Sequence, residues 1–155
     1  MSKLIAISIN QNDFNLPTPE VLQEQSLAIY DLKQSNFFQL VGFEIHEEIK
    51  LNISLSNNSL VFEVSSKTDE ILKTFFLSLT PLKQIINDYY TICESYFNAV
   101  KNLPIDKIES IDMGRKGIHN EGARVIIERF EGRIKTNQDT ARRIFTLIYV
   151  LSYKR

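Results

Sequence analysis

The sequence predicts a single α+β domain in which an antiparallel β-meander packs against a layer of C-terminal helices, with one strand and one helix preceding them. Residues 49–79 contain segments in which apolar and polar residues alternate, the pattern of strands with one buried face. Residues 81–151 repeat apolar residues every three or four positions, which indicates amphipathic helices. The 155 residues are 43% hydrophobic, and a domain of this size buries a core without metal or disulfide.

The N-terminal part predicts one strand and one helix. Residues 3–9 are rich in isoleucine at alternate positions, as expected of a strand. Thr18-Pro19-Glu20 has the residues of a helix start, with Thr as N-cap, Pro at the first helical position and an acid in the first turn. That helix should end near residue 33. Residues 37–41 predict a short strand, followed by a loop from Gly42.

The meander is predicted from three segments, 49–55, 60–64 and 71–79. Residues 56–59, Ser-Asn-Asn-Ser, form the first predicted turn, because Asn tolerates a positive φ better than most residues. Residues 67–70 form the second turn. Each strand keeps its apolar side chains on one face, so the sheet should have one buried side and one solvated side.

A long helix is predicted from Thr80-Pro81, with Thr80 at its start, to about residue 102. Its apolar arc is about 160° wide, which is more than a sheet alone requires, so later helices or a second subunit should cover it. Cys93 lies within this arc and is predicted to be buried rather than nucleophilic.

Two or three further helices are predicted after Pro104. Gly114 is predicted to end the first with a left-handed cap, and Asn120 to cap the next, which Gly132 would end. Thr136-Asn137-Gln138-Asp139 resembles a capping box for the last helix, which buries residues between 141 and 151. Residues 1–155 therefore form one domain, with the sheet first and the helices after it.

The protein is expected in the cytoplasm. A single cysteine cannot form an internal disulfide, which suits a reducing compartment. No stretch has the roughly 18–20 apolar residues of a membrane span, and the first residues do not form a signal peptide. No cofactor or metal site is predicted.

The charges are distributed unevenly along the chain. Residues 1–110 carry a net charge of −6 and no arginine, whereas residues 111–155 carry +5 and every arginine, within an overall charge of −1. Because the guanidinium group suits phosphate and carboxylate, this distribution favours an anionic partner. Salt bridges between these arginines and the acidic N-terminal part are the competing interpretation.

The stretch from Ile111 to Arg124 is the principal candidate site. It holds three of the five glycines and is predicted as a turn between two helices. Backbone N–H groups in such a turn, beside cations, can bind a phosphate or carboxylate. The spacing matches neither a Walker A loop nor GxGxxG after a strand, and a plain helix–helix connection explains the same glycines. The candidate ligand-binding residues are Arg115, Lys116, Gly117, Asn120 and Arg124.

Three other functions are alternatives. His119 and Glu121, with Asp112, could serve as acid–base groups of a small hydrolase or transferase, although neighbours at i and i+2 diverge on a helix. The wide apolar arc, with Tyr149 and Tyr153, could build a homodimer. A basic surface containing Arg142 and Arg143, together with Arg124, Arg129 and Arg133, could bind nucleic acid; this is less favoured because no nucleic-acid-binding motif is present.

Three segments carry a resemblance to a known family. They are LSLTPLKQIINDYYTICESYFNAV (77–100), IESIDMGRKGIHNEGARVIIERF (108–130) and DTARRIFTLIYVL (139–151), with looser similarity at 27–32 and 60–64. On these residues the chain resembles the bacterial uncharacterised protein family 0262. The resemblance implies a bacterial cytoplasmic protein and carries over no functional residue.

Overall fold

A computed structural model of the chain describes residues 3–10, 17–43 and 48–153. The elements in chain order are β1 (Lys3–Ile9), α1 (Pro19–Gln34), β2 (Phe38–Leu40), β3 (Glu48–Ser56), β4 (Ser59–Ser66), β5 (Ile71–Ser78), α2 (Thr80–Asn102), α3 (Ile105–Phe130), β6 (Ile134–Thr136) and α4 (Gln138–Ser152). The predicted α+β class is confirmed, with the sheet packed against C-terminal helices. Most of the predicted loops at 10–17 and 42–47, including His46, lies outside the described residues.

The main sheet has the strand order β1-β3-β4-β5. β3, β4 and β5 form the predicted antiparallel meander. β1 extends the sheet at the β3 edge and runs parallel to β3. The two turns use positive φ at Asn57 and Asp69, as short polar side chains allow. β2 pairs with β6 in a separate two-stranded sheet. The sequence did not predict β6, because three residues are too few to establish a strand period.

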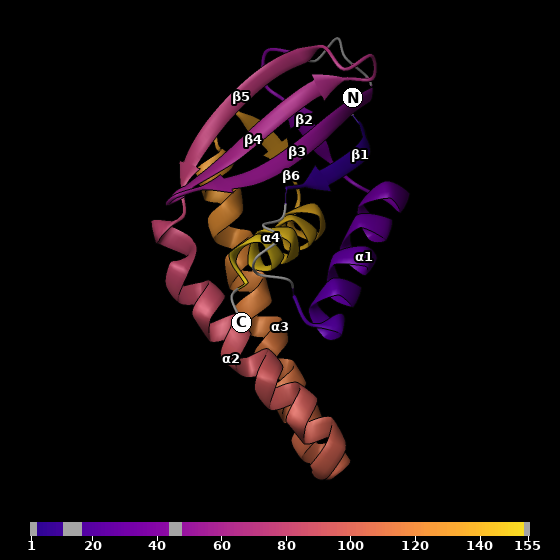
Figure 1. The fold of residues 1–155 in the computed structure, drawn as a ribbon, viewed down its shortest axis with the longest axis vertical. Coiled ribbons are helices and arrows are strands. Elements are labelled where there is room, and N and C mark those ends of the chain that lie inside the picture. Colours follow the sequence, from indigo (N-terminus) through magenta and orange to yellow (C-terminus); the bar gives the residue numbers. More distant parts are fainter. Residues whose placement is uncertain (1–2, 11–16, 44–47, 154–155) are drawn as a thin grey trace.

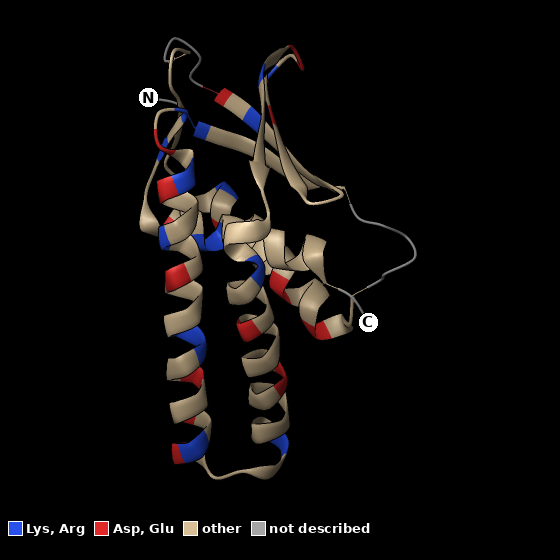
Figure 2. Ribbon diagram, turned by 90° about the vertical axis from the view of Figure 1, so that its left-hand side faces the viewer, with Lys and Arg blue, Asp and Glu red and all other residues tan. Residues whose placement is uncertain are grey.

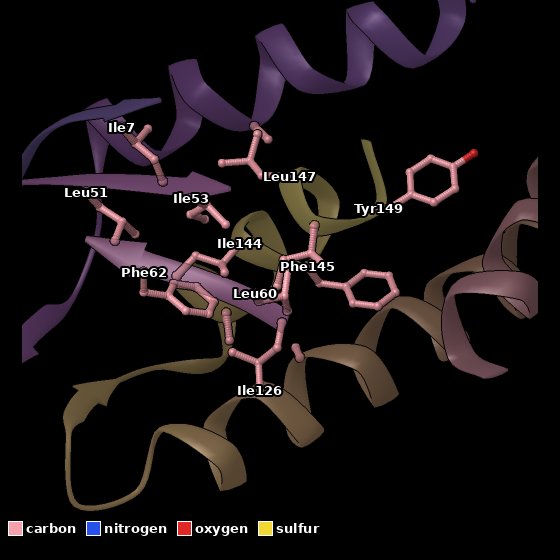
Figure 3. Close-up of a cluster of buried hydrophobic side chains, with 14 of the residues drawn as sticks. Ile7, Leu51, Ile53, Leu60, Phe62, Ile126, Ile144, Phe145, Leu147 and Tyr149 are labelled. Carbon is pink, nitrogen blue, oxygen red and sulfur yellow. The ribbon is translucent and has the colours of Figure 1, made fainter. Parts of the chain in front are cut away.

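α4 lies at the centre of the helical layer, beneath one face of the sheet (Figure 1). Nine of its fifteen residues are buried, and it packs against α1, α3 and β3. Figure 3 shows side chains of β1, β3, β4, α3 and α4 meeting in one apolar cluster, with Phe145 of α4 within it. Residues 144–150 are all buried, so other elements enclose this part of α4 on every side.

The end of α3 is joined to both sheets by one aromatic side chain. The ring of Phe130 makes edge contacts with Phe38 of β2 at 6.2 Å, with Phe62 of β4 at 5.2 Å and with Phe75 of β5 at 5.9 Å between centroids. Such edge-to-face pairs are favourable beyond the apolar area they bury. Gly132 follows with φ of 83°, so the predicted end of this helix is confirmed.

The predicted break at Gly114 and Asn120 is wrong, because α3 runs unbroken from Ile105 to Phe130. Both residues lie in the helix interior, and neither is a cap. The glycines have a packing role instead. A Cβ at Gly122 would lie 2.4 Å from the ring of Phe145, and one at Gly114 would lie 2.8 Å from Cδ1 of Ile92. They therefore let α3 approach α4 and α2 closely.

Two other predicted helix starts are displaced by one residue. Asn137 caps α4 by accepting a hydrogen bond from the Thr140 N–H at 2.9 Å, whereas Thr136 lies in β6 and donates its hydroxyl to the carbonyl of Phe37. Thr80 lies inside α2 rather than before it; its hydroxyl accepts from the Asn58 amide at 2.8 Å. By contrast, Thr18 caps α1 as predicted.

α2 and α3 form a long antiparallel pair whose distal halves project beyond the rest of the molecule (Figures 1 and 2). Cys93 is 1% exposed on the inner side of α2, so its predicted burial is confirmed. Within the described part of the chain, no helix is both long enough and apolar enough to cross a membrane.

Alanine substitutions in α3 test the unbroken helix. Gly122→Ala should lower the free energy of unfolding by about 1–3 kcal/mol, because its methyl group would overlap the Phe145 ring. Gly117→Ala should raise it by about 0.5–1 kcal/mol, because no atom lies within 4 Å and alanine favours a helix. Urea denaturation measures both changes. A loss of stability in Gly117→Ala would contradict the unbroken helix, since a left-handed turn there would disfavour alanine.

Candidate functional site

A cavity of about 290 Å³ lies between α1, α3 and α4, with Tyr89 of α2 in its wall. Each helix contributes side chains spaced three or four residues apart, so that they share one face. Glu24, Leu27, Ala28 and Asp31 come from α1, Arg115, Lys116 and His119 from α3, and Arg142, Arg143 and Thr146 from α4. Segments that are more than 100 residues apart in the sequence thus line one cavity.

Arg115 is the most highly coordinated cation of the cavity. Its guanidinium donates to Asp112 at 2.7 and 3.1 Å, one turn earlier in α3. It lies 3.5 Å from the Glu24 carboxylate and 4.6 Å from the centre of the Tyr96 ring. Hydrogen bonding to Arg115 is the main reason that the pKa of Asp112 lies below its usual range. Arg115 is therefore held in one position by three helices.

Glu24 brings a carboxyl group into the helical layer. Its Oε1 accepts a hydrogen bond from the Tyr89 hydroxyl at 3.0 Å, while its buried Oε2 has no partner among the residues described. Burial raises the pKa of Glu24, and the Tyr89 hydroxyl and Arg115 only partly offset this effect. Burial also raises the pKa of the nearby Cys93 thiol to about 12, so the thiol is not activated.

Arg142 and Arg143 differ in their partners. Nε of Arg143 lies 3.3 Å from the Asp31 carboxylate of α1. Arg142 has no ion-pair partner in residues 3–10, 17–43 and 48–153, and its Nε is buried without an acceptor there. Because a buried N–H normally has an acceptor, Arg142 has unused capacity to bind a group in the cavity.

His119 is neutral at physiological pH. Burial and the charge of Arg142 lower its pKa to about 4. Its Nε2 lies 2.9 Å from the Thr146 hydroxyl, which itself donates to the carbonyl of Arg142 at 3.2 Å. That hydroxyl has one hydrogen, so when it goes to the carbonyl, Nε2 donates to the hydroxyl oxygen and Nδ1 carries no proton. The ring also stacks on Tyr89, at 5.3 Å between centroids.

The five predicted ligand-binding residues all lie on α3, but they do not all face the cavity. Arg115 and Lys116 line the cavity, whereas Gly117, Asn120 and Arg124 do not. Gly117 and Asn120 belong to the helix interior rather than to a turn, and Arg124 pairs with Glu121 and Glu128 on an exposed face. The structure therefore contains no nest of glycine N–H groups between residues 114 and 124.

The three acid–base candidates also separate. His119 lines the cavity, while Glu121 is exposed and accepts two hydrogen bonds from Arg124. The Asp112 carboxylate is occupied by Arg115 and by Lys116, whose Nζ lies 3.2 Å away. His119 and Glu121 thus share no cleft in the described structure. No three His, Cys, Asp or Glu residues among those described gather as metal ligands.

Of the other two alternatives, the arginines considered for nucleic acid are dispersed and the tyrosines considered for a homodimer are buried. Arg142 and Arg143 face the cavity, Arg124 lies on the exposed side of α3, and the Arg133 guanidinium lies 5.6 Å from the centre of the Phe75 ring. Tyr149 and Tyr153, considered for a homodimer, are 1% and 7% exposed within the single chain. Their rings are therefore part of the packed interior.

Sequence reasoning missed Glu24, Asp31 and Thr146 and did not assign Arg142 and Arg143 to a ligand site. A signal was present in the spacing, since Arg115 with His119, and Arg142 with Thr146, are each four residues apart and share a helix face. The predicted break at Gly114 concealed the first pair. No local sequence pattern indicated that α1 would pack beside α3 and α4 and bring Glu24 and Asp31 into the cavity.

The pKa of His119 predicts a loss of stability on acidification. Because its folded-state pKa of about 4 lies below the unfolded value near 6.5, the unfolded chain binds more protons between these pH values. The free energy of unfolding should fall by about 2 kcal/mol from pH 7 to pH 5 on this account.

Urea denaturation at the two pH values, compared with His119→Gln, isolates this contribution, because effects of other groups are common to both proteins. The variant should lose about 2 kcal/mol less than the wild type on acidification. An NMR titration of the imidazole gives the pKa directly, and a value of 6 or above would contradict the expected burial effect.

Comparison with known proteins identifies the family. Residues 1–154 match the Uncharacterised protein family (UPF0262). A UPF0262 protein of Ruegeria pomeroyi is 45% identical over 157 residues, which cover 99% of this chain and 98% of that protein. Relatives from Dinoroseobacter shibae and Cereibacter sphaeroides are each 46% identical and covered to 99%. No solved structure matches the chain. The chain belongs to the UPF0262 family of bacterial proteins.

Proposed function

We propose that the protein binds a small anionic molecule, phosphorylated or carboxylate, in the cavity between α1, α3 and α4. The observation that carries this proposal is Arg142, a cavity-lining arginine with no acidic partner among the described residues and with its Nε buried without an acceptor. An anionic ligand would supply the missing acceptor and charge. Arginine suits this role because its planar donors match phosphate and carboxylate oxygens.

The charge balance of the cavity supports an anion. Its lining contains two acids, Glu24 and Asp31, against the four cations Arg115, Lys116, Arg142 and Arg143. Burial raises the pKa of Glu24, so the charge of this acid is easier to lose than that of an exposed glutamate. His119 adds hydrogen-bonding capacity without charge at pH 7. A ligand with one or two negative charges would therefore be attracted.

The rigidity of the cavity supports binding as well. Asp112 holds both Arg115 and Lys116, and Asp31 holds Arg143. Side chains that are already ordered lose less conformational entropy when a ligand binds. The paired cations are thus already ordered around Arg142, the cavity cation that has no ion-pair partner among the described residues.

The size of the cavity limits the ligand. About 290 Å³ lies at the lower end of the roughly 300–1,000 Å³ typical of small-molecule sites. This favours a small phosphorylated or carboxylated metabolite over a nucleic-acid strand. We infer binding rather than catalysis, because Glu121, the predicted acid–base partner of His119, lies outside the cavity. We also infer a cytoplasmic location, since the sole cysteine is free and buried.

Titration calorimetry with inorganic phosphate, glycerol 3-phosphate and succinate tests the proposal. At least one should bind, and Arg142→Gln should weaken its binding by about 10–100-fold, as expected for loss of a charged hydrogen bond. The melting temperature of the free variant should be unchanged or higher, because the substitution breaks no ion pair within the described structure.

Arg124→Gln is the matched control. It removes an arginine that is paired with Glu121 and Glu128 outside the cavity, so affinity should stay within twofold of the wild type. Equal loss of affinity in both variants would indicate general electrostatic attraction and overturn the site. Failure of every anion to bind would overturn the proposed function itself.

A further inference from the structure

A second, larger cavity of about 610 Å³ lies between the β3–β4 turn, the first half of α2 and the end of α4. It shares no lining residue with the cavity between α1, α3 and α4, here called the anion cavity. We propose that this cavity binds a second class of ligand, an aromatic molecule carrying a single anionic head group, such as an aromatic carboxylate. This proposal is independent of the function proposed for the first cavity.

The floor of the cavity is apolar and aromatic. Leu79, Ile86, Tyr149 and Tyr153 line it and are each at most 7% exposed. Tyr90 adds a further wall, its ring 5.7 Å from that of Tyr153. Aromatic walls bind an aromatic ligand through offset or edge contacts, in addition to the apolar area buried. The shape and chemistry therefore suit a planar apolar body.

The Tyr149 hydroxyl is a donor without an acceptor. The residue is 1% exposed, and its hydroxyl forms no hydrogen bond with any residue that the structure describes. Figure 3 shows its oxygen pointing away from the apolar cluster that surrounds the other labelled side chains. The hydroxyl oxygen is not among the fully buried side-chain atoms that lack a partner, so it is accessible, and a ligand oxygen in this cavity would accept its hydrogen bond.

The charged group that lines the cavity is a cation, while Glu24 and Glu94 lie within electrostatic range of Tyr149. Lys83 is the single charged side chain among the lining residues that the structure describes, and no carboxylate lines the cavity there. Leu79, another lining residue, is the N-cap of α2, whose first turn contains no acid, although the Ser78 hydroxyl accepts a hydrogen bond from the Thr80 N–H. The positive end of the helix dipole is thus not neutralised locally. Lys83 and the helix start together favour one negative charge.

The remaining polar groups of the rim are neutral. Asn57, Asn87 and Ser152 line it, and Asn58 is held in place by its hydrogen bond to Thr80. Neutral donors and acceptors tolerate a carboxylate without requiring more charge. One cation, neutral rim groups and an apolar floor are complementary to a monoanionic amphiphile rather than to a polyphosphate.

The test uses 2-naphthoate as the anionic probe and 2-naphthalenemethanol as its neutral counterpart, followed by ¹H–¹⁵N NMR of the full chain. 2-Naphthoate should shift backbone signals around Leu55, Ile86 and Ser152, and leave those of Ala28, Arg115 and Thr146 at the anion cavity unmoved. The neutral probe should bind at least tenfold more weakly. Equal binding of the two probes, or shifts centred on the anion cavity, would overturn the proposal.

Two variants assign the roles of individual groups. Lys83→Gln should weaken 2-naphthoate binding about tenfold, whereas Lys101→Gln, an exposed lysine near the other end of α2, should not change it. Tyr149→Phe should also weaken binding of the carboxylate while leaving that of the neutral probe within twofold. If Lys83→Gln binds 2-naphthoate as tightly as the wild type, the assigned ligand class is wrong.

Discussion

The close approach of α3 to α4 at Gly122 and Phe145 is the constraint on which the structure depends. Any side chain at Gly122 would meet the Phe145 ring, and Phe145 lies at the centre of α4, the most completely buried helix. α4 in turn lies beneath the sheet and among the other helices (Figure 1). If α3 moved outward, the Phe130 contacts with both sheets would be lost as well, because that residue ends the same helix.

The same approach helps to form the cavity in which we propose that an anion binds. α3 and α4 lie close together at Gly122. Arg115, His119 and Arg142 carry polar side chains that line a cavity between the two helices instead of filling it. α1 forms the third wall of this cavity. Ion pairs from Glu24 to Arg115 and from Asp31 to Arg143 join the acidic and basic parts of the chain there. The interpretation that the arginines pair with the N-terminal acids therefore holds in part, since Arg115 and Arg143 do so and Arg142 has no acidic partner among the described residues.

Local sequence patterns were sufficient for the sheet and for the type of most helices. The strict alternation in β3 and β4, the Thr18 cap and the end of α3 at Gly132 are all local properties. The break predicted at Gly114 was wrong because glycine has two uses that look alike in sequence. It ends helices, and it also lets helices approach closely, and the difference lies in a distant residue such as Phe145. The position of β6 depended likewise on its partner β2.

The sequence by itself determined the fold class, the meander, the burial of Cys93 and the concentration of arginine after residue 111, since each follows from periodicity or composition. Only the tertiary structure decided which charges meet. Arg115 and Arg142 are the same residue type, and nothing in the sequence distinguishes their surroundings. In the structure Arg115 pairs with Asp112 and Glu24, whereas Arg142 has no carboxylate partner among the described residues. Pairing depends on distances of a few ångströms between helices, and those distances are set by packing across the whole core.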